Sequence, residues 1–398
     1  MSFVEPELRP RKNWPLECRG PLEHSQEKYA AAKVNFFDPN GWANGQAFEA
    51  ALHAQREGPL RWVAGPNVLA VLGHAEALTV LSDPQRFTST RGTGLTEGGT
   101  TGRSLNLDDA PRSLELRRMV QAFLDEPGVS SSRLQLRARD AVERARAKRD
   151  ADALTDLGEP MARGSFGEQL ELSVDEVSTL ARLTEGLARS GLKREAQEAA
   201  DAELRELLRA GLKEGRAGRF WELGREALRR GLTEEDAMFL LRLVVQTGHE
   251  STAQAIAGAV HAALESKLPF DGSSRAVEEW LRWTSPLIRF SRVATADTQL
   301  AGVSVREGTR LVAIFPVVNR DPRVFEAPHV IRLDRTPNPH LAFGAGPHAC
   351  AGARHARAQV AAVMEALNDV PRPALAGEPT RLVSAVTRGF TSVPLRFS

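Results

Sequence analysis

The sequence has little cysteine: only Cys18 and Cys350 occur in a chain of 398 residues. Two cysteines cannot build the disulfide framework of a small secreted protein, so the sequence predicts a reducing compartment. The chain also lacks an excess of either charge, with 52 Lys and Arg against 51 Asp and Glu, which predicts no binding to nucleic acid or to a membrane surface. No run reaches the ~18 apolar residues of a membrane helix, and the start has no secretion signal. We therefore expect a soluble, cytoplasmic protein.

A glycine-rich stretch near the C-terminal end carries the second cysteine. Residues 343–352 read FGAGPHACAG, and residues 353–358 resemble the opening of a helix. Glycine is too permissive for regular structure and proline lacks a backbone donor, so the stretch predicts a shaped loop. Cys350 then lies beside the positive end of a helix, which favours thiolate over thiol. Such a sulfur is a nucleophile or a metal ligand; the alternative is a buried structural cysteine.

The complete spacing Phe-Gly-x-Gly-x-His-x-Cys-x-Gly resembles the haem-ligand loop of the cytochrome P450 family. The resemblance implies that the Cys350 thiolate is the axial ligand of the iron of haem b. It also implies that His348 contacts a haem propionate and that Phe343 packs beside the thiolate. Gly344 and Gly352 belong to the same cofactor-binding loop.

A long helix is predicted over residues 233–264. It opens with a capping box, in which the Thr233 hydroxyl caps the helix and Asp236 follows three residues later. Residues 246–252, QTGHEST, then interrupt an apolar pattern. Glycine alone costs about 1 kcal/mol inside a helix. Such a conflict is typical of a functional site, although a polar patch on the surface is the alternative.

The P450 family has a glycine, an acid and a threonine at this point, where its central helix passes over the haem. Gly248 and Glu250 match that pattern, while Thr247 stands for a small residue and Ser251 for the threonine. The resemblance implies that Glu250 and Ser251 relay protons, with Thr252 as the candidate if the register differs by one. Thr247 and Ser251 share a helix face, so the Ser251 hydroxyl could bond the Thr247 carbonyl and loosen the helix.

Arginines that resemble the propionate ligands of the family occur at two further places. Arg117 lies on a predicted helix that follows the break at Pro111, and Arg292 lies in a predicted strand. The family has a histidine four residues before the first arginine, and this chain has Ser113 there. One propionate contact is therefore missing from the expected set.

Three charged residues resemble a buried network of the family. Glu279 and Arg282 are three residues apart on a predicted helix and can pair on one face. Taken alone, they are as well explained by a surface salt bridge of little energetic value. They match the Glu-x-x-Arg motif of the family, and Arg335 matches its third member.

The fold class we expect is mainly α with a small β-rich region, in one P450-like domain over residues 1–398. Residues 1–40 are expected to form an N-terminal arm, and residues 88–106, rich in Gly and Thr, a flexible loop on the substrate side. A hairpin is predicted from 60–63 and 68–72, and four or five charged helices from 130–230. The short stretch 261–275 predicts that one connecting helix is trimmed.

The resemblance implies a haem-thiolate monooxygenase that inserts one oxygen atom from O2 into a small apolar organic substrate. By motif position we expect Thr247, Ile288, Phe290 and Phe390 to line the substrate pocket. No flavin or nicotinamide motif is evident, so electrons are expected from a separate ferredoxin or flavodoxin with its reductase. Two alternatives stay open: a peroxygenase that uses hydrogen peroxide, and a haem protein that binds or senses a ligand without catalysis.

Overall fold

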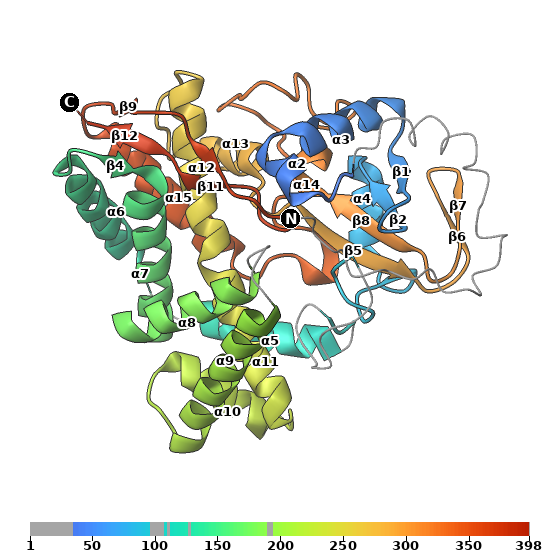
Figure 1. Ribbon diagram of the computed structural model, residues 1–398, viewed down its shortest axis with the longest axis horizontal. Coiled ribbons are helices and arrows are strands. Elements are labelled where there is room, and N and C mark those ends of the chain that lie inside the picture. Colours follow the sequence, from blue (N-terminus) through green and yellow to red (C-terminus); the bar gives the residue numbers. More distant parts are fainter. Residues whose placement is uncertain (1–34, 96–106, 110–111, 126–128, 189–193, 398) are drawn as a thin grey trace.

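The structure of the chain is a computed structural model that describes residues 35–95, 107–109, 112–125, 129–188 and 194–397 (Figure 1). Of the expected N-terminal arm, residues 1–34 lie outside the described residues. Phe36 and Phe37, by contrast, are buried. Of the expected flexible loop 88–106, residues 96–106 also lie outside the described residues.

Helices make up most of the described chain, as expected. Their bounds are α2 Pro39–Ala43, α3 Gln46–Glu57, α4 His74–Ser82, α5 Arg112–Asp125, α6 Ser131–Arg146, α7 Glu159–Leu170, α8 Val174–Ala188, α9 Arg194–Glu214, α10 Arg219–Arg229, α11 Glu234–Gly248, α12 Glu250–Glu265, α13 Ser274–Thr284, α14 Phe315–Val318 and α15 Ala353–Asn368. A π-helix, η2 (Ala153–Gly158), leads into α7, and a 3₁₀ turn, η3 (Gly346–His348), precedes α15. The described part of 130–230 thus holds five α-helices and η2, and no helix occupies 266–273, where a connecting helix was expected to be trimmed.

The strands form one five-stranded sheet and three smaller ones. The large sheet has the order β1-β2-β8-β5-β3, with β2 and β8 parallel and the other neighbours antiparallel. Its strands are β1 Leu60–Val63, β2 Val68–Val71, β3 Phe87–Thr88, β5 Arg289–Ala294 and β8 Arg310–Ile314. The smaller sheets contain β4 Ala151–Asp152, β6 Thr298–Leu300, β7 Val303–Val305, β9 Ala374–Leu375, β10 Thr380–Arg381, β11 Phe390–Ser392 and β12 Pro394–Arg396. The predicted hairpin is present as β1 and β2, and every residue of β2 and β8 is buried, as suits strands that are covered on both faces.

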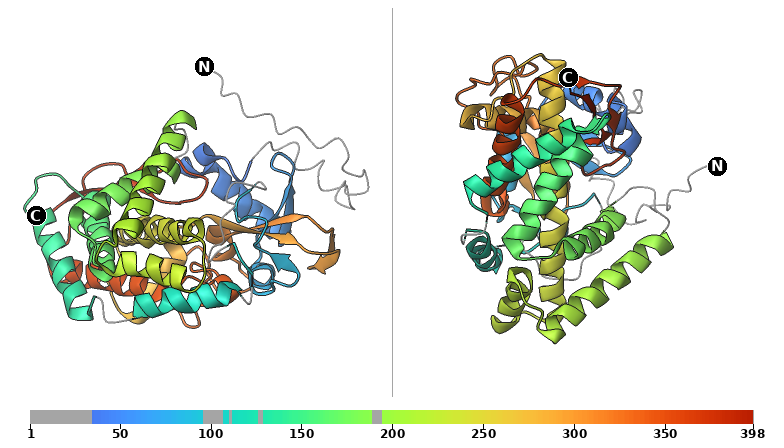
Figure 2. Two further views of the ribbon diagram at one scale, coloured as in Figure 1. Left: turned by 90° about the horizontal axis from the view of Figure 1, so that it is seen from below. Right: turned by 90° about the vertical axis from the view of Figure 1, so that its left-hand side faces the viewer.

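The helix α12 lies at the centre of the molecule. Its residues from Thr252 to Ala263 are all buried, and a helix that is apolar on every side belongs in a core. The large sheet lies to one side of α12 and the helices α6 to α10 lie to the other (Figures 1 and 2). Small residues allow close packing here: a Cβ added to Gly258 would lie 2.8 Å from the side chain of Thr284.

The expected single helix over 233–264 is wrong, because the structure has two helices there. The predicted cap is present, with the Thr233 hydroxyl accepting from the Asp236 N–H at 3.1 Å. The helix α11 then ends at Gly248, and α12 begins at Glu250. Between them His249 has φ −133° and ψ −44°, outside the helical range. The break falls within the polar interruption of the sequence.

No helix among the described residues is both long and apolar enough to cross a membrane.

Candidate active site

The loop before α15 has the shape that its glycines require. Gly344 and Gly346 both have φ near 68°, in the left-handed region. A Cβ on Gly346 would also lie 2.6 Å from the Leu81 carbonyl oxygen, so only glycine fits there. The Cys350 N–H donates to the Phe343 carbonyl at 2.8 Å and closes the loop. The exposed side chain of Cys350 is thereby presented at the start of α15, with Gly352 as the residue that caps the helix.

The helix start acts on the Cys350 thiol in the predicted direction, but in the protein alone burial outweighs it. Although Cys350 is exposed, protein atoms surround its sulfur closely enough that desolvation raises the pKa of the thiol. The Gly352 N–H and the charges of Arg117 and Arg357 act in the opposite direction and do not outweigh it. A coordinated metal ion deprotonates a thiol outright. Ionisation of Cys350 would therefore follow from iron binding, with the helix end as a minor contribution.

Arg292 is a buried cation with few partners. Its Nη1 donates to the Ser291 carbonyl at 2.8 Å, the one hydrogen bond recorded for this guanidinium among the described residues. Burial lowers the pKa of Arg292 to about 10, against the opposing charge of Asp109. A guanidinium has five N–H donors, so most of its capacity is left for an anionic group. The predicted role as a propionate ligand fits this arrangement.

The other predicted propionate ligands lie around the same loop. Arg117, on α5, donates to the carbonyls of Pro347, at 3.4 Å, and Ala349. Four residues earlier, the Ser113 hydroxyl is buried and has no hydrogen-bond partner among the described residues. An orphaned donor at this position is the observation we would expect if a polar group of the cofactor normally faces it.

His348 is held by residues that the sequence did not single out. Its Nε2 lies 3.2 Å from the Ser89 hydroxyl and 3.6 Å from a carboxylate oxygen of Asp109. Burial by itself would raise the pKa of Asp109, but the contact with His348 and hydrogen bonds from Thr88 and Ser89 outweigh it and bring the pKa to about 2. Asp109 is therefore an anion at neutral pH and orients His348. The one feature of the sequence that could have pointed to Asp109 is its position just before the predicted break at Pro111.

The break between α11 and α12 places the predicted relay residues at the start of α12. Glu250 and Ser251 are half-buried and Thr252 is buried. The predicted bond from Ser251 to the Thr247 carbonyl is not recorded. The hydroxyl that bonds back to the preceding turn is that of Thr247, which donates to the Leu243 carbonyl at 2.8 Å. Thr247 itself is exposed, as a residue beside an open space would be.

The break is packed against Phe166 on α7, a contact that sequence reasoning missed. A Cβ on Gly248 would lie 2.6 Å from Cδ2 of the Phe166 ring. The ring also meets His249 edge-on, with the centroids 6.0 Å apart and the planes at 67°. Burial, and then the charge of Arg163, lower the pKa of His249 to about 4, so it is neutral at neutral pH. Gly248 is thus required for the close approach of α7.

Two of the four residues predicted to line the substrate pocket belong to the core instead. Ile288 has no exposed surface, and Phe390 is 3% exposed, with its ring 4.9 Å from that of His261. Phe290 is half-buried and, like the exposed Thr247, stays a candidate. Val386, whose carbonyl accepts from the Ile288 N–H at 2.7 Å, is 45% exposed and replaces Ile288 as the candidate on this side.

The three predicted charged residues meet in the core. Arg282 donates to both oxygens of Glu279, at 2.8 and 2.7 Å, and Arg335 donates to one at 2.9 Å. Two further donors complete the set: the Arg332 N–H at 2.8 Å and the Asn338 amide at 3.1 Å. Although burial opposes it, these bonds lower the pKa of Glu279. The carboxylate is therefore buried, ionised and saturated.

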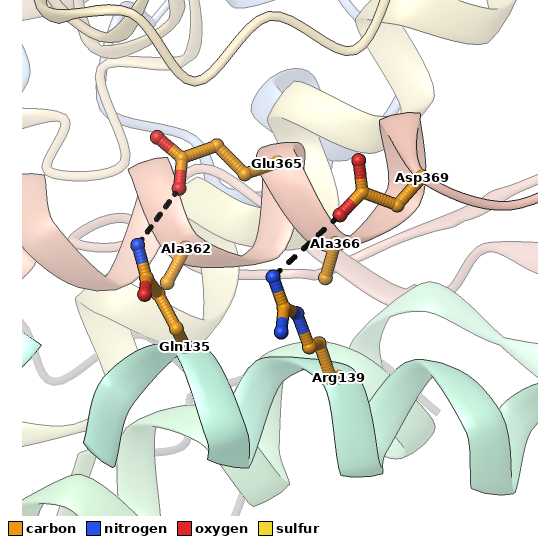
Figure 3. Close-up of a pocket in the computed structure, with 6 residues that line it drawn as sticks. All are labelled: Gln135, Arg139, Ala362, Glu365, Ala366 and Asp369. Carbon is orange, nitrogen blue, oxygen red and sulfur yellow. Dashed lines mark hydrogen bonds and ion pairs between the residues drawn. The ribbon is translucent and has the colours of Figure 1, made fainter. Parts of the chain in front are cut away.

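A separate groove lies between α6 and α15 (Figure 3). Its volume is about 240 Å³, and it is lined by Gln135, Arg139, Ala362, Glu365, Ala366 and Asp369. Ala362, Glu365 and Ala366 lie in the half of α15 far from Cys350, and the two sides of the groove pair with each other, Gln135 with Glu365 at 3.5 Å and Arg139 with Asp369 at 3.9 Å. The groove offers no group for redox chemistry, so we place the site at Cys350.

Comparisons with known proteins find similarity to cytochromes P450. A family model for cytochrome P450 matches residues 273–367. The chain is 27% identical over 406 residues to a steroid C26-monooxygenase of Mycolicibacterium smegmatis, an alignment that covers 94% of this chain and 93% of that protein. It is 39% identical over 139 residues to a biotin biosynthesis cytochrome P450 of Bacillus subtilis, which covers 33% of this chain and 35% of that protein. The crystal structure of OxyD, a P450 involved in the biosynthesis of vancomycin-type antibiotics, superposes with a TM-score of 0.78 at 26% identity, over 92% of this chain and 99% of that one.

Proposed function

Because this chain is a cytochrome P450 of the bacterial type, an oxidoreductase of the monooxygenase class, we propose that it inserts one oxygen atom from O2 into a small apolar organic substrate. The family implies a haem cofactor, and we propose that it is haem b. The observation that carries the proposal is the loop 343–352, which presents one exposed cysteine at a helix start. A buried arginine with spare donors, Arg292 on β5, interacts electrostatically with Asp109, which contacts His348 of this loop.

Different residues of the site would bind different parts of the cofactor. Cys350 would ligate the iron, and Arg292, Arg117 and His348 would neutralise the propionates with charge-assisted hydrogen bonds. Haem with a thiolate ligand supplies reductive activation of O2 and cleavage of the O–O bond. Asp109, whose carboxylate lies 3.6 Å from Nε2 of His348, keeps that imidazole oriented.

The distal residues would supply protons. Glu250 in the first turn of α12 can exchange protons with solvent, and the Ser251 hydroxyl, one residue later, can pass one toward the cofactor side. Gly248 contributes by its lack of a side chain, since any Cβ there would collide with Phe166. The break at His249 interrupts the regular helix directly before Glu250 and Ser251.

We infer the substrate class from the side chains that are candidates for lining the substrate pocket. Thr247, Phe290 and the exposed Val386 are small or apolar, which suits an apolar molecule. A relative acts on a steroid by its printed name, and a small lipid, terpene or aromatic compound would suit these side chains equally. Electrons would come from a separate ferredoxin or flavodoxin with its reductase. We further propose a cytoplasmic location, on the low cysteine content.

The first experiment tests whether Cys350 is the iron ligand. Reduced protein under carbon monoxide is expected to show the strongly red-shifted band of a thiolate-ligated haem. Cys350→His should lose the band, while the matched variant Cys18→Ala should keep it. The reverse result would overturn the assignment.

The second experiment tests the reaction. A screen for substrates by spectral shift is followed by turnover with a reconstituted ferredoxin and reductase, and in parallel with hydrogen peroxide alone. Product that needs the electron donor and O2 supports a monooxygenase. Product with peroxide alone would make the chain a peroxygenase, and ligand binding without product in either arm would leave a haem protein that only binds its ligand.

A further inference from the structure

An arginine outside the predicted site is stacked on the residue beside the thiolate. Arg357, in the second turn of α15, places its Cζ 4.5 Å from the centre of the Phe343 ring. The same Phe343 accepts the Cys350 N–H through its carbonyl at 2.8 Å. A guanidinium over an aromatic face is an attractive cation–π arrangement, here with an Arg357 side chain that is 40% exposed. A positive charge is thus held against the segment that carries the iron ligand.

Glu278 fixes the direction of this arginine. Arg357 donates to it through Nε at 2.5 Å and through Nη2 at 3.0 Å, a bidentate geometry that allows one orientation of the guanidinium. Burial would raise the pKa of Glu278, but hydrogen bonds from His340 and Arg357 outweigh it and bring the pKa to about 2. The carboxylate is therefore ionised at every pH at which the protein would work.

His340 is the third member of the arrangement and also lies beside the Phe343 ring. Its Nδ1 accepts from the Ala342 N–H at 3.2 Å, so Nε2 carries the proton that it donates to Glu278 at 2.9 Å. The imidazole lies 6.2 Å from the Phe343 ring, centre to centre, and its side chain is 2% exposed. The three side chains form one hydrogen-bonded unit, which we call the Phe343 clamp: Glu278, His340 and Arg357.

We propose that Arg357, held in place by Glu278, is a positioning residue that makes the cysteine-bound iron easier to reduce. The inference rests on the proposed function, since it requires Cys350 to be the iron ligand. The physical reason is electrostatic. Reduction by one electron adds negative charge at the iron and its thiolate, and a fixed cation nearby favours that state. Glu278 carries the opposite charge at the same place, so it orients the cation and partly offsets it.

The clamp makes a prediction that a structural role does not make. Removal of the arginine leaves the Glu278 carboxylate, so Arg357→Ala should lower the reduction potential. Removal of the carboxylate charge leaves the arginine, so Glu278→Gln, which keeps the shape, should raise it. Loss of packing alone would move both variants in the same direction.

The experiment is a redox titration of the purified, haem-loaded protein with dithionite and mediators, which needs no partner protein. For Arg357→Ala we expect the ratio of reduced to oxidised haem at a fixed potential to fall about tenfold, which for one electron is 59 mV. Glu278→Gln should raise this ratio, and Arg357→Lys, which keeps the charge without the planar stack, should fall between wild type and Arg357→Ala. The matched control is Arg354→Ala on the same helix. Arg354 has the same charge but an 81% exposed side chain, with Asp125 3.9 Å away, and its loss should change the ratio less than twofold.

The outcomes separate the two proposals. A wild-type protein without the thiolate band under carbon monoxide would overturn the proposed function itself. A wild-type protein with that band, but with Arg357→Ala and Glu278→Gln shifted in the same direction, or with Arg354→Ala shifted as far as Arg357→Ala, would overturn the role of the clamp alone. If Arg357→Ala does not bind haem, the opposite shifts of Arg357→Lys and Glu278→Gln decide the question.

Discussion

The strongest stability prediction concerns Glu279, which accepts five hydrogen bonds in the core. Glu279→Ala removes the carboxylate and leaves Arg282, which has no exposed surface, and Arg335, which is 5% exposed, without their anionic partner. Loss of one member of a buried ion pair costs about 3–5 kcal/mol, because the remaining charge stays desolvated. Both arginines keep some carbonyl acceptors, such as those of Asn319 and Val330, so the lower half of this range is expected.

The chain contains a matched control for this change. Glu143 and Arg146 are also three residues apart on a helix, with a two-point contact at 2.9 and 3.1 Å, but the glutamate side chain is 61% exposed. An exposed pair contributes about 0–1 kcal/mol, so Glu143→Ala should be nearly neutral. The measurement is the free energy of unfolding in guanidinium chloride, together with the haem content of the purified protein. Equal losses for Glu279→Ala and Glu143→Ala would show that burial does not decide the value of this network.

Further outcomes are expected at four positions. Ser113→His should slow haem transfer to an apo-globin more than tenfold, because a charge-assisted hydrogen bond is worth about 1.5–3 kcal/mol; an unchanged rate would mean that the contact is already made. Ser251→Ala should raise the peroxide released per electron consumed, with substrate bound, and an unchanged ratio would remove Ser251 from the proton path. Gly248→Ala should cost about 1–3 kcal/mol of unfolding free energy by overpacking, most of which Phe166→Leu in the same chain should restore; two additive losses would contradict the contact. The folded-state pKa of Asp109 is about 2 against an ordinary 3.8, so its stabilisation is present above about pH 4 and is lost as the pH falls toward 2. Asp109→Asn should therefore flatten the unfolding free energy between pH 4 and 2, and an unchanged acid slope would contradict this.

The sequence was sufficient to predict those features of the fold that depend on residues close together in the chain. The capping box of Thr233 is present because it needs only residues three apart, and the hairpin β1–β2 needs only two short apolar runs and a turn. The loop 343–352 is similar, since its glycines take positive φ wherever the loop is placed. In each case the residues that interact are near neighbours in the chain, and their types are enough.

The errors arose where tertiary contacts decide. Motif position put Ile288 and Phe390 near the substrate, but whether a side chain lines a space or fills a core depends on what packs against it. The hairpin around Val386 packs on Ile288, and Gln254 on α12 holds the backbone of Phe390 through both its N–H and its carbonyl. The helix break followed the same rule. Its polar residues were visible in the sequence, whereas the aromatic ring that packs against it comes from α7, about 80 residues earlier in the chain.

The two sides of the site are held in different ways, and this difference has a consequence for function. On the ligand side, Cys350 is fixed by its own N–H, by a glycine that packs on the Leu81 carbonyl, and by Phe343 within the clamp of Glu278, His340 and Arg357. These contacts hold the Cys350 sulfur in one position, as the proposed iron ligand requires. On the distal side, the Thr247 hydroxyl bonds only within its own helix, to the Leu243 carbonyl, and the helix is interrupted at His249, between Thr247 and Ser251. If Thr247, Phe290 and Val386 line the substrate pocket as we propose, substitutions there would change which substrate fits without moving Cys350. On our proposals, substitutions in the clamp would change the reduction potential of the iron and leave the substrate side unchanged, so the two properties would vary independently.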